Sequence, residues 1–228
     1  MNNSTDNNAS KDAEWLDTVP ASRIASLLNS TIRPQDIDET AISRLRSSAR
    51  VGPVFKKILL SRLNKNSKTQ SLIPGSTNTA SSDPAIQILL SSPSSAENLA
   101  KIIGAQIHGT SLRQLITKAE IESMQQWLGR DIYIFALKQL QNTPISLGLH
   151  KPHQSLSQTI QNDGLSILTG WVNRQNESDR TKIELLHGDI LTINALNEEL
   201  EEKIGSVLSD SLVQEAVTAY KSLNVQKT

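Results

Sequence analysis

The stretch from Ser94 to Gln141 constrains the fold more than any other part of the chain, because it holds four short apolar patterns separated by turn signals. Apolar residues recur there at intervals of three and four, which is the period of a helix that buries one face. Four helices joined by short turns must fold back on one another. The stretch therefore predicts a compact helical core, and we expect the whole chain to be an all-α, irregular multi-helix bundle.

Polar residues at the expected helix starts support this reading. A Ser or Thr followed three residues later by Glu has the spacing of a capping box, in which the two residues satisfy each other's backbone N–H groups. An Asp before Pro suits the N-cap and the first helical position. The expected starts are at Ser94 with Glu97, Thr117 with Glu120, Asp83 with Pro84, and Ser155.

Two glycines mark expected helix ends. Gly109, directly after His108, and Gly129 each follow an apolar helical pattern. Glycine adopts the left-handed conformation of a helix C-cap without steric cost. We therefore expect both glycines to be left-handed caps.

Composition divides the chain into four parts. Residues 1–13 are polar and are expected to form a disordered tail, and residues 14–64 an N-terminal helical segment. Residues 65–83 are rich in Ser, Thr and Asn and are expected to be a flexible linker. Residues 84–228 are then the helical core domain.

One segment of that domain is ambiguous. Residues 183–193 contain two short apolar runs around His187-Gly188-Asp189. They fit either a small β-hairpin or two helix fragments, and the hairpin is slightly favoured.

The overall composition limits the classes of function. Lys plus Arg and Asp plus Glu are both 23, so nothing global indicates binding to nucleic acid. The absence of cysteine excludes disulfides and thiolate metal sites. No apolar run approaches the roughly 18 residues that span a bilayer. A cytoplasmic chain is expected, with any membrane contact peripheral.

Catalytic and metal-binding motifs give no positive signal. His108 stands at a predicted helix C-terminus, where a donor side chain satisfies the last carbonyls, so a structural role is favoured over a catalytic one. His150 and His153 are loop residues without a carboxylate between them, which disfavours a metal site. Phosphate-binding glycine loops and the GxSxG motif are absent from the sequence. We expect no enzyme activity, no metal and no cofactor.

A basic stretch is the sharpest charge feature. Between Ala41 and Gln70 the chain has no Asp or Glu. The stretch contains Arg44, Arg46, Arg50, Lys56, Lys57, Arg62, Lys65 and Lys68. These residues are either ordinary exposed helix faces or a binding surface for an acidic protein or an anionic membrane.

Four of these cations are the candidate partner-binding residues. Arg46 and Arg50 lie four apart and share a face of one expected helix, and Lys56 and Lys57 open the next. None belongs to the apolar stripes of those helices, so we expect their charge reversal to leave the fold intact.

The central stretch resembles a known family. Gly104 to Arg113 fits the pattern G-x-x-[IL]-H-G-x-x-[IL]-R, with His108 and Gly109 at its centre. This pattern is similar to one in the YscK/SctK proteins of bacterial type III secretion systems, relatives of MxiK and OrgA. A second match contains Gly164 and leads to Trp171. The resemblance covers roughly residues 89–186, with a looser similarity over residues 15–32.

The resemblance implies a non-enzymatic adaptor with a mainly helical fold. Such proteins act in the cytoplasmic sorting platform, at the cytoplasmic face of the inner membrane. They connect the cytoplasmic domain of an inner-membrane ring protein to the pod protein. Gly104, His108, Gly109, Arg113, Gly164 and Trp171 carry over as structural motif positions.

Two alternatives remain open at this point. One is a soluble helical enzyme or ligand-binding domain with a pocket near His108 and Arg113. A deep pocket that joins His108 to a carboxylate would favour it, whereas exposed apolar or charged patches would favour the adaptor. The other is a peripheral membrane protein that acts through the basic stretch alone.

Overall fold

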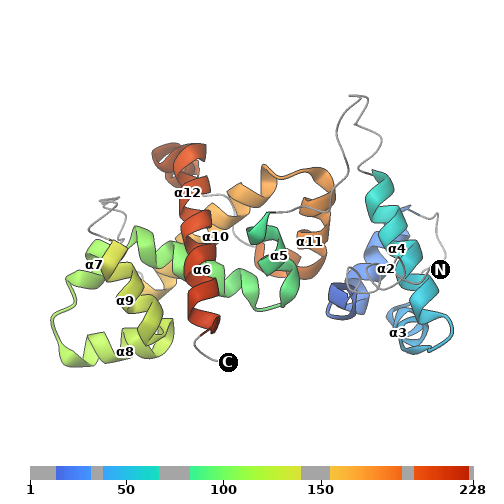
Figure 1. Cartoon of the computed structure of the whole chain (residues 1–228), viewed down its shortest axis with the longest axis horizontal. Helices are drawn as coiled ribbons and strands as arrows, with labels where there is room; N and C mark the ends of the chain where they lie inside the picture. Colours follow the sequence, from blue (N-terminus) through green and yellow to red (C-terminus); the bar gives the residue numbers. More distant parts are fainter. Residues whose placement is uncertain (1–13, 32–37, 67–82, 140–154, 192–197, 226–228) are drawn as a thin grey trace, which may run out of the picture. The chain divides into compact units, whose positions relative to one another are not determined.

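The computed structural model describes residues 14–31, 38–66, 83–139, 155–191 and 198–225. All regular structure in these ranges is helical, which confirms the all-α prediction. Figure 1 shows these helices, coloured along the sequence. Contacts divide the chain into two units. Unit 1 comprises residues 1–93 and 176–188, and unit 2 comprises residues 94–175 and 189–228.

Unit 1 begins with a short 3-10 helix, η1 (Glu14–Asp17), followed by three helices: α2 (Ala21–Thr31), α3 (Glu39–Ser47) and α4 (Gly52–Asn66). It also contains α5 (Pro84–Ser91) and most of α11 (Glu177–Leu191). Its apolar core joins residues from η1 to α4 with two from α11. The core residues include Trp15, Leu16, Ile24, Leu28, Ile42, Leu59, Leu63, Leu185 and Leu186.

The domain division expected from the sequence differs from these units. It assigned residues 84–93 and 176–188 to the core domain, whereas contacts group them with the N-terminal helices. Leu185 and Leu186 pack into the apolar core of unit 1. The ring Nε2 of buried His187 also donates to the carbonyl of Leu89, at 2.6 Å. The predicted linker lies mostly outside the described residues, as do the tail and His150 with His153.

The hairpin expected at residues 183–193 is wrong, because residues up to Leu191 form the end of α11. Asn176 starts this helix: its Oδ1 accepts from the backbone N–H of Asp179 at 2.9 Å. Its Nδ2 donates to the Asp179 carboxylate at 2.7 Å. The buried Ile183 and Leu186 lie three apart, on one helical face. A local cap and a continuous apolar face thus favour one helix over two strands.

Unit 2 is built on the packing of α6 (Ser95–Ile107) against α10 (Leu156–Asn173). The last helix, α12 (Glu198–Val225), contacts both, and its helical geometry is interrupted at Gly205. Three shorter helices complete the unit: α7 (Gly109–Arg113), α8 (Lys118–Leu128) and α9 (Arg130–Gln139). Side chains of these three helices form a second apolar cluster together with one residue each from α6 and α10. It contains Ala105, Leu112, Met124, Leu128, Tyr133, Ala136 and Ile160.

Most of the expected helix ends are confirmed. Thr117 and Glu120 form a complete capping box, and Ser155 accepts from the backbone N–H of Gln158. Asp83 caps α5 ahead of Pro84. Gly129 ends α8 with a φ of 92°, a conformation in which glycine is favoured.

Two expected caps are wrong. The Ser94 side chain makes no capping hydrogen bond to α6. Gly109 is the first residue of α7, and positive φ angles in the described residues occur at Gly129 and Gly205 alone. His108 is shared between the two helices: its N–H donates to Gly104 and its carbonyl accepts from Leu112. The chain therefore passes from α6 into α7 without a left-handed residue.

Candidate functional site

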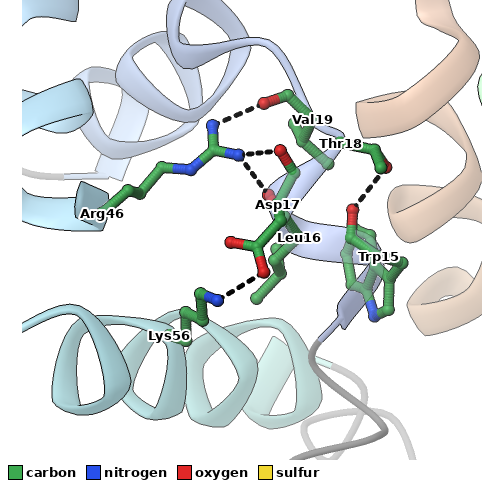
Figure 2. Close-up of polar contacts among 7 residues, drawn as sticks. All are labelled: Trp15, Leu16, Asp17, Thr18, Val19, Arg46 and Lys56. Carbon is green, nitrogen blue, oxygen red and sulfur yellow. Dashed lines mark hydrogen bonds and ion pairs between the residues drawn. The ribbon is translucent and has the colours of Figure 1, made fainter. Parts of the chain in front are cut away.

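The candidate partner-binding cations are split between two environments in unit 1. Arg46 reaches the turn that joins η1 to α2 (Figure 2). Its Nη1 donates to the Val19 carbonyl at 2.6 Å, and its Nη2 donates to Leu16 at 2.9 Å and also to Asp17. One half-buried guanidinium thus satisfies three backbone carbonyls.

Lys56 belongs to the same arrangement. Its Nζ lies 2.5 Å from Oδ2 of Asp17 and forms an ion pair (Figure 2). Both Arg46 and Lys56 therefore hold the η1 turn against α3 and α4. The expectation that their charge reversal would leave the fold intact does not agree with these contacts. Their proposed role in partner binding is a separate prediction.

Arg50 and Lys57 are exposed instead. In the described part of the chain, no hydrogen bond or ion pair engages either side chain. They stand beside three aliphatic residues with large exposed fractions: Val51 at 42%, Val54 at 57% and Ile58 at 50%. We call these five residues the α4 outer face: Arg50 and Val51, which directly precede α4, and Val54, Lys57 and Ile58 within it.

This exposed face was not predicted, although the sequence of α4 contains a signal for it. Val54, Phe55, Ile58, Leu59 and Leu63 are all apolar, and at the helical period they cannot share one side. Leu59 and Leu63 are buried in unit 1, whereas Val54 and Ile58 are exposed. Apolar residues around more than one side of a helix indicate a second covered surface.

The motif glycines in unit 2 allow α6 and α10 to approach closely. A Cβ atom placed on Gly104 would lie 1.9 Å from the carbonyl oxygen of Ile160. A Cβ on Gly164 would lie equally close, 1.9 Å, to the carbonyl oxygen of Ala100. The two glycines are therefore required on opposite sides of one helix crossing.

His108 lies at the same crossing. Its Nε2 is 2.7 Å from Oδ2 of Asp163, the residue before Gly164, and both side chains are buried. Asp163 was not predicted from the sequence, because a pairing across 55 residues has no local signature. The bond satisfies two buried polar groups, which would otherwise carry a desolvation cost.

The other motif positions are separated. Trp171 is buried in unit 2, whereas Arg113 is exposed on α7. The structure thus joins His108 to a carboxylate but does not bring Arg113 to the pair.

Unit 2 also has an open depression of about 480 Å³ between α6, α8 and α10. Its lining includes Lys101, Trp127 and Gln161, and neither His108 nor Asp163. The Nζ of Lys101 lies 5.3 Å from the centre of the Trp127 ring, a cation–π contact. The depression is therefore distinct from the buried pair.

Within the residues that the structure describes, no group of three or more His, Asp or Glu residues could hold a metal ion. Among the helices described, none has both the length and the apolar character of a membrane span.

Comparison with known protein families, with curated proteins and with solved structures finds no match for the chain. The resemblance described above consequently depends on its motif residues alone.

Proposed function

We propose that this chain is a non-enzymatic adaptor of a type III secretion sorting platform. It would link the cytoplasmic domain of the inner-membrane ring protein to the pod protein, at the cytoplasmic face of the inner membrane. The observation that carries the proposal is the α4 outer face, where three exposed aliphatic side chains stand beside two exposed cations. Exposed apolar side chains grouped at helical spacing favour a protein-interaction site.

The motif residues support the proposal in a second way. Gly104, Gly164 and His108 all contribute to the packing of α6 on α10, where they are buried. The resemblance implies structural roles at these positions. A helix crossing is a structural role that explains why glycine is needed at both 104 and 164.

The enzyme alternative would use the His108–Asp163 pair. A general base must come within about 3 Å of the proton that it removes. His108 and Asp163 are buried, and the depression on unit 2 does not include them. The geometry therefore favours the adaptor.

Co-expression of the full chain with the ring-protein cytoplasmic domain and the pod protein of the same bacterium tests the proposal. Size-exclusion chromatography with light scattering should show a complex that contains all three. Deletion of the chain from the bacterium should abolish type III secretion, and its return should restore it. The proposal fails if neither protein binds the chain and secretion continues without it.

A further inference from the structure

Helix α4 has apolar residues on two sides. Leu59 and Leu63 enter the core of unit 1, with exposed fractions of 2% and 3%. Val54 and Ile58, four apart, lie on a different side and are 57% and 50% exposed. Val51 precedes Val54 by three residues and extends the same stripe. A helix with apolar residues on two sides is expected to be covered on both.

The charged residues that flank this stripe in the sequence are all positive. Arg50 and Lys57 are exposed, and within the described ranges no acidic side chain pairs with them. Arg46 and Lys56 are excluded from the surface charge because they hold the η1 turn. The sequence from 41 to 70 contains no Asp or Glu that could neutralise the stripe. A matching surface must therefore be apolar at its centre and acidic at its edges.

We propose that the α4 outer face binds an acidic amphipathic helix of a partner protein. The inference rests on the proposed function, in which that partner is a component of the sorting platform. From Val51 to Ile58 the stripe covers about 10 Å at 1.5 Å per residue, which matches two turns of a second helix. The partner helix presents apolar residues at intervals of three and four, with Asp or Glu beside them.

An anionic membrane is the competing occupant, and the side chains disfavour it. Helices that lie in the membrane interface typically insert Trp, Phe or Leu. The exposed stripe consists of Val and Ile, without an aromatic residue. Such short branched side chains suit packing between the ridges of two helices.

The first test places a photo-crosslinking amino acid at position 54 of the full chain in the source bacterium. The matched control carries it at position 116, because Ile116 is 89% exposed on unit 2. Mass spectrometry of the product should identify one protein segment with apolar residues at helical spacing and flanking Asp or Glu. A basic or neutral segment, a crosslink within the chain itself, equal products from both positions, or no protein product would overturn the inference.

The second test measures binding of that segment as a synthetic peptide. Val54→Gln with Ile58→Gln should weaken binding about tenfold or more, whereas Ile116→Gln with Val207→Gln should not change it. Val207 is a fair control because it is 83% exposed, outside the α4 outer face. Equal effects of the two pairs would overturn the inference.

Charge is tested with a second matched pair. Arg50→Glu with Lys57→Glu should weaken binding most at low salt, and acid-to-Lys changes in the peptide should restore it. Arg130→Glu with Lys221→Glu changes the net charge equally, at exposed positions elsewhere, and should have little effect. If the changes in the peptide do not restore binding, Arg50 and Lys57 do not recognise acidic residues of the partner, and the inference is overturned.

Vesicles of phosphatidylglycerol and phosphatidylethanolamine test the competing occupant. If the wild-type chain floats with these vesicles and the Val54→Gln, Ile58→Gln variant does not, the inference is overturned in favour of a membrane.

The proposed function and this inference can also fail separately. An acidic helix from a protein outside type III secretion would refute the proposed function alone. A platform complex that forms without the α4 outer face would refute the inference alone.

Discussion

Gly164 on α10 lies against Gly104 on α6: a Cβ atom at position 164 would lie 3.0 Å from the backbone nitrogen of Gly104. The obstacle on each side is backbone rather than a flexible side chain. The two helices therefore cannot accept even a methyl group here without moving apart.

We expect Gly164→Ala and Gly104→Ala each to lower the free energy of unfolding by about 1–3 kcal/mol or more, as overpacking does. Urea denaturation followed by circular dichroism measures the change. Gly188→Ala in α11 is the control, because its Cβ would first meet the Arg23 guanidinium at 3.7 Å, an ordinary contact. That variant should be stabilised by about 0.5–1 kcal/mol. Wild-type stability of both crossing variants would show that α6 and α10 do not pack as described.

The His108–Asp163 pair gives a second prediction. Asp163→Ala removes the acceptor and leaves the buried Nε2 of His108 without it, which should cost about 1–3 kcal/mol. Asp163→Asn retains an oxygen that can accept, so it should cost less. Urea denaturation of the two variants gives the comparison. The structural assignment is wrong if Asp163→Ala unfolds at the wild-type urea concentration.

Arg46 gives a third prediction, which distinguishes it from Arg50. Arg46→Ala leaves carbonyls of Leu16, Asp17 and Val19 without their cationic donor and should cost at least about 1.5 kcal/mol. Arg46→Lys should recover only part of this, because an ammonium lacks the planar fork of donors. Arg50→Ala should change stability by less than about 0.5 kcal/mol. Hydrogen exchange should show that Arg46→Ala reduces the protection of the η1 and α2 amides. Equal protection of these amides in Arg46→Ala and Arg50→Ala would contradict the prediction.

The capping box of α8 gives a prediction about pH. The Thr117 hydroxyl, 2.7 Å from the Glu120 carboxylate, lowers the pKa of Glu120, and the Thr117 backbone N–H adds to this. Because the pKa is lower in the folded state, the stabilisation is complete above the ordinary glutamate pKa. It is lost as the pH falls through the lowered pKa.

Thr117→Val tests this directly by removing the hydroxyl. In an NMR titration, the pKa of Glu120 should rise part of the way toward its ordinary value, since the backbone bond from position 117 remains. Glu120→Gln should remove the pH-dependent part of the capping box's contribution to the free energy of unfolding. An unchanged Glu120 pKa in Thr117→Val would show that the hydroxyl is not its main cause.

Local signals predicted the features that involve a few neighbouring residues. Thr117 with Glu120, Asp83 with Pro84, Ser155 and Gly129 were all identified because a cap satisfies backbone groups within one helical turn. Such hydrogen bonds depend little on the rest of the fold. The left-handed cap predicted at Gly109 is wrong, because α7 begins directly after α6 and no left-handed residue is required there.

The sequence by itself determined the helical class and the helix starts at Asp83, Thr117 and Ser155, because periodicity and caps are local properties of the chain. Tertiary structure decided which residues meet. It paired His108 with Asp163, placed Arg46 on the η1 turn and left Arg50 exposed. These contacts join residues that are distant in the sequence, and their free energy depends on burial that exists only after the helices pack. Two arginines four residues apart can therefore have opposite roles, one inside the fold and one on its surface.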